Sequence, residues 1–179
     1  MNNNYLFTSE RLGFRNWKTS DTELLYKMNT DDAVMEFFPR KSTKIEVVNF
    51  INRMQTQFEQ RGFCYFAVEL LETKQFIGFI GLSEQTYKAD FNPSIDIGWR
   101  LLQKYWHKGY ATEGAKASLD FAFKEINLKK IVSIAPKINI GSIAVMEKIG
   151  MQKVKYFKHP MLSEFPKIEN CVLYQIENN

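Results

Sequence analysis

The stretch that decides the fold is Ile95-Asp-Ile-Gly-Trp-Arg-Leu-Leu-Gln-Lys-Tyr-Trp-His-Lys-Gly-Tyr-Ala-Thr112. Its first half is rich in β-branched and aromatic residues and predicts a strand, whereas apolar residues between positions 111 and 126 recur at helical spacing. The first turn of a helix has free N–H groups and the positive end of the helix dipole, and both attract anions. We therefore expect this strand, loop and helix to form a phosphate site.

On both sides of this stretch, the sequence predicts further strands and helices. A strand is expected at residues 8–17, and two helices begin at the capping boxes Ser20-Asp-Thr-Glu23 and Thr43-Lys-Ile-Glu46, the second ending at Gly62. Three strands, at 63–71, 76–86 and 94–102, predict an antiparallel meander. The remaining pattern indicates a strand at 130–135, a helix at 142–149 and strands at 152–157 and 171–176. This order predicts a mixed sheet with helices on both faces.

The composition is typical of one globular domain spanning residues 1–179, with 45% hydrophobic content. No apolar run is long enough to span a bilayer and the N-terminus has no leader-like pattern, so we expect a cytoplasmic protein with no membrane segment. Cys64 and Cys171 lie in strand-like stretches and are expected to be reduced core thiols, not a disulfide or metal pair. The net charge of +4 argues against a nucleic-acid groove and suits a small anionic ligand. A monomer and a homodimer are both compatible with the sequence.

Five short motifs follow one another along the chain: Ser9-Glu-Arg-Leu12, Ile97-Gly-Trp99, Tyr105-Trp-His-Lys-Gly-Tyr-Ala-Thr-Glu113, Asn139-Ile-Gly-Ser142 and Glu147-Lys-Ile-Gly-Met151. In this order and spacing they resemble the GNAT superfamily of acetyl-CoA-dependent N-acetyltransferases, in particular its RimJ/RimL-like branch. The resemblance implies an α/β (α+β) fold with a mixed, mostly antiparallel sheet of six to seven strands, helices on both faces and a splayed, V-shaped cleft. It also implies that acetyl-CoA is the co-substrate and that no metal is needed.

The resemblance assigns coenzyme-binding roles to two segments. The backbone amides of the loop would hold the diphosphate, with Lys108 adding charge, through His107, Lys108, Gly109, Tyr110, Ala111 and Thr112. Trp106 stands where the superfamily usually has Arg or Gln, and His107 replaces a frequent Gly. Leu101 and Leu102 would supply backbone hydrogen bonds to the pantetheine arm. The Asn139 side chain either satisfies a polar group of that arm or only caps the following helix.

Candidate catalytic residues follow from the same comparison. Many GNAT enzymes use a Tyr acid at the position of Met146, whose thioether cannot donate a proton. The resemblance to the RimL-like branch implies that Ser142 serves as the acid instead, unless it merely caps its helix. Glu84 and Asp96 are the candidate general bases, although a structural ion pair or a solvated carboxylate is the commoner state of such residues. Asp96 is expected to share its strand face with Gly98 and Arg100. A histidine or a chain of water molecules remains an alternative base.

The acceptor is expected at the other end of the cleft, near Glu36-Phe-Phe-Pro39, Trp17 and the closing strands, with at least one of Phe37 and Phe38 in the core. The sequence thus predicts an acyltransferase that moves the acetyl group of acetyl-CoA to a primary amine, on a protein N-terminus or a small molecule, by direct attack in a ternary complex. The alternatives are a catalytically silent acyl-CoA-binding sensor or interaction module on the same fold, and a nucleic-acid-binding protein.

Overall fold

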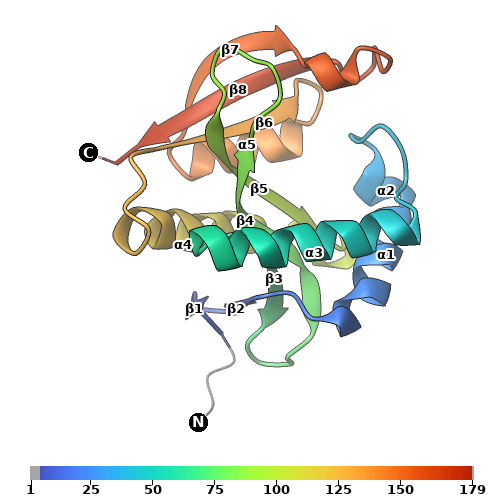
Figure 1. Ribbon diagram of the computed structural model, residues 1–179, viewed down its shortest axis with the longest axis vertical. Coiled ribbons are helices and arrows are strands. Elements are labelled where there is room, and N and C mark those ends of the chain that lie inside the picture. Colours follow the sequence, from blue (N-terminus) through green and yellow to red (C-terminus); the bar gives the residue numbers. More distant parts are fainter. Residues whose placement is uncertain (1–4, 179) are drawn as a thin grey trace.

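The computed structural model describes residues 5–178, which fold around one eight-stranded sheet (Figure 1). The strands are β1 (Phe7–Thr8), β2 (Leu12–Arg15), β3 (Tyr65–Leu70), β4 (Phe76–Gln85), β5 (Ser94–Leu101), β6 (Lys130–Pro136), β7 (Gln152–Lys158) and β8 (Asn170–Glu177). Their order across the sheet is β1-β2-β3-β4-β5-β6-β8-β7, and neighbours are antiparallel except for β5 and β6. The mixed, mostly antiparallel sheet is confirmed. It has an additional strand because the predicted opening strand is interrupted by a turn between β1 and β2.

Eight helical segments connect these strands in the described part of the chain. The α-helices are α1 (Thr22–Thr30), α2 (Asp32–Met35), α3 (Lys44–Arg61), α4 (Tyr110–Lys124) and α5 (Ile140–Lys148), and the short 3₁₀ helices are η1 (Thr19–Asp21), η2 (Gln103–Tyr105) and η3 (Pro160–Leu162). Within residues 5–178, no helix is both long and apolar enough to cross a membrane.

The capping box predicted for α3 is confirmed, whereas the one predicted for α1 is wrong. In α3, the Thr43 hydroxyl accepts from the Glu46 amide at 3.3 Å, the Thr43 amide donates to the Glu46 carboxylate at 2.8 Å, and the helix ends at Gly62 with a φ of 77°. Before α1 the Asp21 carboxylate instead accepts from the Lys18 amide at 2.8 Å. The chain therefore forms η1 first, and α1 begins at Thr22.

Helices cover both faces of the sheet, as predicted. Consecutive strand residues point to opposite faces, so Phe79 of β4 lies on one face of the sheet and Ile80 on the other. The Phe50 ring of α3 lies 5.3 Å from the Phe79 ring. On the other face, α4 approaches so closely that a Cβ added to Gly114 would lie 2.3 Å from the Ile80 side chain. Figure 1 shows α3 in front of the sheet and α4 behind it.

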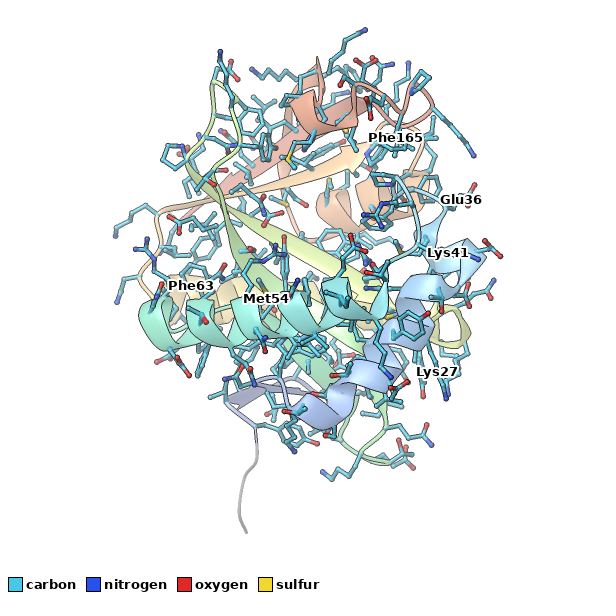
Figure 2. The ribbon with its side chains drawn as sticks, turned by 45° about the vertical axis from the view of Figure 1, so that its right-hand side comes forward. Lys27, Glu36, Lys41, Met54, Phe63 and Phe165 are labelled. Carbon is cyan, nitrogen blue, oxygen red and sulfur yellow. The ribbon has the colours of Figure 1, made fainter. Side chains whose placement is uncertain are left out.

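The core is continuous from the sheet into both helical layers. Met54 of α3, labelled in Figure 2, is fully buried, as are Phe14, Phe66 and Ile80 of the sheet. Cys64 and Cys171 are both free and buried, which confirms their prediction as core thiols. Burial raises the pKa of both thiols, so neither is an activated thiolate.

The sheet forks between its two parallel strands. Within the described residues, β5 and β6 pair only at Asp96 and Val132, and the Ser133 hydroxyl donates to the Ile97 carbonyl at 2.9 Å just beyond that pair. By contrast, β4 and β5 remain in register from Ser94 to Leu101. The second half of β5 therefore has one free backbone edge, which is the V-shaped opening expected from the sequence.

Candidate active site

A cavity of about 580 Å³ lies at the fork of the sheet. One wall comes from β5 and β6, and a second comes from the start of α5. The connection between α2 and α3, whose Glu36 and Lys41 are labelled in Figure 2, contributes Phe37 and Phe38. The cavity thus joins the free edge of β5 to side chains from both halves of the chain.

Residues 96–100 of β5 all line this cavity, and alternation places Asp96, Gly98 and Arg100 on one face of the strand. Side chains two apart on a strand share a face, which is the reason the sequence predicted the same grouping. The antiparallel register fixes them, because Asp96 pairs with Ser83 and Arg100 with Phe79 of β4. An acidic and a basic side chain are thereby held on either side of a glycine.

Asp96 sits in a hydrogen-bonded pocket. The Tyr65 hydroxyl donates to its Oδ1 at 2.6 Å and the Gln85 side-chain amide donates to the same atom at 3.0 Å. Burial raises the pKa of Asp96 to about 6, and the hydrogen bonds from Tyr65 and Gln85 oppose that rise. Near pH 7 Asp96 is therefore mostly ionised and has a higher proton affinity than an exposed aspartate. These properties suit a general base.

Glu84, the other candidate base, lies outside the cavity. It is the neighbour of Ser83, which pairs with Asp96, so its side chain points to the opposite face of the sheet. Its carboxylate accepts from the guanidinium of Arg61, the last residue of α3, at 3.2 Å. The structure therefore does not bring Glu84 together with the other predicted site residues.

The predicted phosphate loop ends at an uncapped helix N-terminus. No side chain caps α4, and its N-cap, Gly109, has a φ of 81°. His107 also adopts a left-handed conformation, with a φ of 59°. A non-glycine residue in this region costs about 1 kcal/mol or more, so the loop keeps a glycine-like shape although His replaces Gly. The exposed turn presents the first amides of α4 to an anion.

Glu113 in the first turn of α4 anchors this helix end to the turn between β1 and β2. Its carboxylate accepts from the Ser9 hydroxyl at 2.6 Å, the Arg11 amide at 2.8 Å and the Arg11 side chain at 2.7 Å. Burial opposes ionisation, but these hydrogen bonds outweigh it and hold the pKa of Glu113 below its usual value. The Arg11 guanidinium also lies 4.4 Å from the centre of the Tyr110 ring. The sequence contained both motifs but gave no sign that they meet.

The backbone of β5 at the fork differs in one respect from the expectation. The Leu102 amide donates to the Ile77 carbonyl at 2.9 Å, so it belongs to the sheet and does not face the cleft. Alternation along the strand then turns the amides of Leu101 and Trp99 toward the fork. The Leu101 carbonyl accepts from the Trp106 indole at 2.8 Å, which closes the loop onto the strand. Trp99 therefore replaces Leu102 as the second backbone donor at the fork.

Asn139 and Ser142 both line the cavity at the start of α5. The Asn139 side-chain oxygen accepts from the Ser142 amide at 3.0 Å, so the capping role of Asn139 is confirmed. Because Asn139 supplies the cap, this helix end does not need the Ser142 hydroxyl. Met146, one turn later, is buried and also lines the cavity.

The aromatic residues expected around the acceptor are arranged differently from the prediction. Neither Phe37 nor Phe38 joins the buried core, and Phe38 is 37% exposed. Both line the cavity, because α2 ends at Met35 and the chain that follows it forms part of the cavity wall. Trp17 is instead buried, and its indole donates to the Tyr65 carbonyl at 2.6 Å. The predicted acceptor region is thus partly core and partly cavity wall.

Residues 11–152 match the family described as an acetyltransferase (GNAT) domain. The chain belongs to the GNAT acetyltransferase family. It is therefore an acyltransferase, and GNAT domains use acetyl-CoA as the acetyl donor. The residues of this GNAT chain fit that ligand, because the open turn at α4 has amides for a diphosphate and the free edge of β5 has amides for an extended arm.

Several relatives support the assignment. An uncharacterized N-acetyltransferase of Bacillus subtilis, YnaD, is 33% identical over 152 residues, which are 84% of this chain and 85% of the relative. The crystal structure of a GNAT-family acetyltransferase from Bacillus anthracis has a TM-score of 0.79 at 30% identity, covering 95% of this chain and 96% of that one. RimL, a ribosomal L7/L12 alpha-N-protein acetyltransferase in complex with coenzyme A, shares the fold with a TM-score of 0.77 at 14% identity, covering 96% and 97%.

Proposed function

We propose that this GNAT enzyme transfers the acetyl group of acetyl-CoA to a primary amine by direct attack in a ternary complex. The observation that carries the proposal is the position of Asp96. A half-buried carboxylate with a raised pKa lines the same cavity as Ser142 and the free edge of β5. A proton acceptor, backbone donors and a hydroxyl are thereby placed around one space.

The coenzyme would be held along the loop and the fork. The amides from His107 to Thr112 and the charge of Lys108 would bind the diphosphate, because the α4 N-terminus is uncapped and exposed. The fork-facing amides of Trp99 and Leu101 would bind the arm as a further strand would, and the Asn139 amide group lies on the same cavity wall. When bound, this ligand supplies an activated thioester carbonyl.

Each of three groups then has one task. Asp96 accepts a proton from the acceptor's ammonium group, which leaves a neutral amine. A backbone N–H of β5 at the fork stabilises the negative charge that develops on the carbonyl oxygen. Ser142 donates its hydroxyl proton to the departing thiolate and receives in its place the proton that the acylated nitrogen loses, a relay that the Met146 thioether cannot perform. We also propose that residues 1–179 act as one acetyltransferase domain, since β8, beyond the matched region, pairs with β6 along its length.

The RimJ/RimL-like branch is our proposal for the position within the family. Its support is the motif order in the sequence together with the RimL-like fold. Protein N-termini and small amines are then the two acceptor classes to test.

The proposed transfer is tested by thiol release from acetyl-CoA in the presence of amines and N-terminal peptides. We expect release with at least one acceptor, at a rate that depends on Asp96. Tight coenzyme binding in a thermal-shift assay without thiol release from any acceptor would instead support the silent acyl-CoA sensor.

A further inference from the structure

Arg100 is a half-buried cation that lacks an anionic partner among residues 5–178. Its Nη1 donates to the Asn29 side-chain oxygen at 2.8 Å, and its guanidinium lies 3.7 Å from the centre of the Phe38 ring. The Nε of Arg100 is buried and has no hydrogen-bond partner among residues 5–178, and in the same range no carboxylate forms a salt bridge with this residue. A guanidinium has five N–H donors, so several remain to be satisfied.

The rest of the cavity is also short of negative charge. The lining includes two carboxylates, those of Glu46 and Asp96, and two guanidinium groups, those of Arg53 and Arg100. Glu46 is already paired with Arg40, which lies outside the lining. No salt bridge to Arg53 occurs in the described part of the chain. A buried N–H donor without a partner is costly, and the Nε of Arg100 would be satisfied by a ligand that brings a negatively charged acceptor.

The positions on β5 give the approximate spacing of the two charged groups. Asp96 and Arg100 share one face and are four residues apart, which places their Cα atoms about 13 Å from each other. Gly98 lies midway and has no side chain, so an amine bound there has Asp96 on one side and Arg100 on the other. A short acceptor can therefore offer its ammonium group to the carboxylate and an anion to the guanidinium.

We propose that the acceptor is a small amine that also carries a carboxylate or phosphate group, and that Arg100 binds this anion. The inference rests on the proposed acetyl transfer and specifies its substrate class. The planar guanidinium fork matches a carboxylate in two parallel hydrogen bonds, and the same donors fit a phosphate. Burial lowers the pKa of Arg100 to about 10, so this side chain is still charged near neutral pH. Arg100 is thus a specificity-determining residue of the acceptor site.

The test compares matched acceptors in the thiol-release assay. The panel consists of amino carboxylates with spacers of different length, the corresponding amino carboxamides, and amino phosphonates. Wild type should prefer the charged acceptors over the carboxamides by about 10- to 100-fold in kcat/KM, the effect expected for a hydrogen-bonded ion pair. Comparing carboxylates with phosphonates identifies which anion the site takes.

Variants connect this preference to Arg100. Arg100→Met should abolish it, mainly by raising KM for the charged acceptors, and should change KM for acetyl-CoA little. Arg100→Lys should keep part of the preference. Arg61→Met, which removes a guanidinium outside the cavity, is the matched control and should behave like wild type. Thermal unfolding is measured alongside, to separate a loss of fold from a loss of acceptor binding.

Three outcomes would overturn the inference. Equal use of carboxylates and carboxamides by wild type is the first, and an Arg100→Met enzyme that keeps the preference is the second. The third is thiol release only with amines that lack an anion, which refutes the acceptor class while the transfer function stands. No release with any amine refutes the transfer function as well, so the two failures are distinguishable.

Discussion

Asp96 is the residue on which the proposed chemistry depends, and its pKa gives a test by pH. If Asp96 must be ionised to take the proton of the bound ammonium group, log kcat/KM should rise with a slope of about 1 below pH 6 and stay level between pH 6 and the pKa of the amine. In Asp96→Asn, the slope should be about 1 throughout and the rate near pH 7 should fall by about 100-fold or more. A wild-type profile with no break near pH 6 would contradict this role.

Ser142 is tested by comparing turnover with binding. Ser142→Ala should lower kcat by about tenfold or more, because the thiolate then leaves without a proton donor. The affinity for acetyl-CoA should change little, since the Asn139 side chain caps α5 through the Ser142 amide, which alanine retains. Steady-state kinetics and calorimetric titration of the coenzyme measure the two quantities. Unchanged turnover would remove Ser142 as the acid.

His107 tests the backbone shape of the phosphate loop. Its φ of 59° is accessible to glycine and costly for a β-branched residue. His107→Val should lower the free energy of unfolding by about 1–2 kcal/mol and weaken coenzyme binding, whereas His107→Gly should keep both near wild type. Urea denaturation and coenzyme titration provide the comparison. If valine binds coenzyme as well as glycine does, the left-handed conformation is not required.

At the scale of elements, the anchoring of α4 by Glu113 determines where its open N-terminus lies. Replacing Glu113 with Gln weakens the bonds from Ser9 and Arg11 and should lower stability near pH 7 by about 1–3 kcal/mol. Because the folded-state pKa of Glu113 is depressed, its contribution is present above the unfolded-state pKa and is lost as pH falls through the folded-state value. The stability difference should therefore shrink below about pH 4. A difference independent of pH would show that the charge plays no part.

Most elements could be predicted because their determinants are local. Thr43, Glu46 and Gly62 mark the ends of α3 within the sequence itself. The alternation along β5 grouped Asp96 with Gly98 and Arg100 correctly, since Tyr65 lies against the first two and its neighbour Phe79 against the third. The start of α1 was predicted wrongly for a tertiary reason. The guanidinium of Arg15 donates to the Asp21 carboxylate at 2.7 and 2.8 Å. This buried contact holds Asp21 where its carboxylate caps η1 and not α1.

At the scale of the whole molecule, the site combines residues whose contacts no local pattern encodes. Glu84 and Asp96 looked equivalent in sequence, and only the register of β4 against β5 places them on opposite faces. The partners of Asp96, Tyr65 and Gln85, come from two other strands. The unpaired state of Arg100 is likewise a property of the assembled cavity. The phosphate loop, in contrast, was readable because strand, loop and helix are contiguous.

The central claim is that the first-turn amides of α4 bind a diphosphate beside the forked sheet. Amide chemical shifts, recorded while the protein is titrated with coenzyme A and separately with pantetheine, test it most directly. We predict that amides of residues 107–112 shift strongly with coenzyme A and little with pantetheine, which has no diphosphate, while Trp99 and Leu101 respond to both. Saturable coenzyme A binding that leaves the amides of residues 107–112 unmoved would contradict the claim.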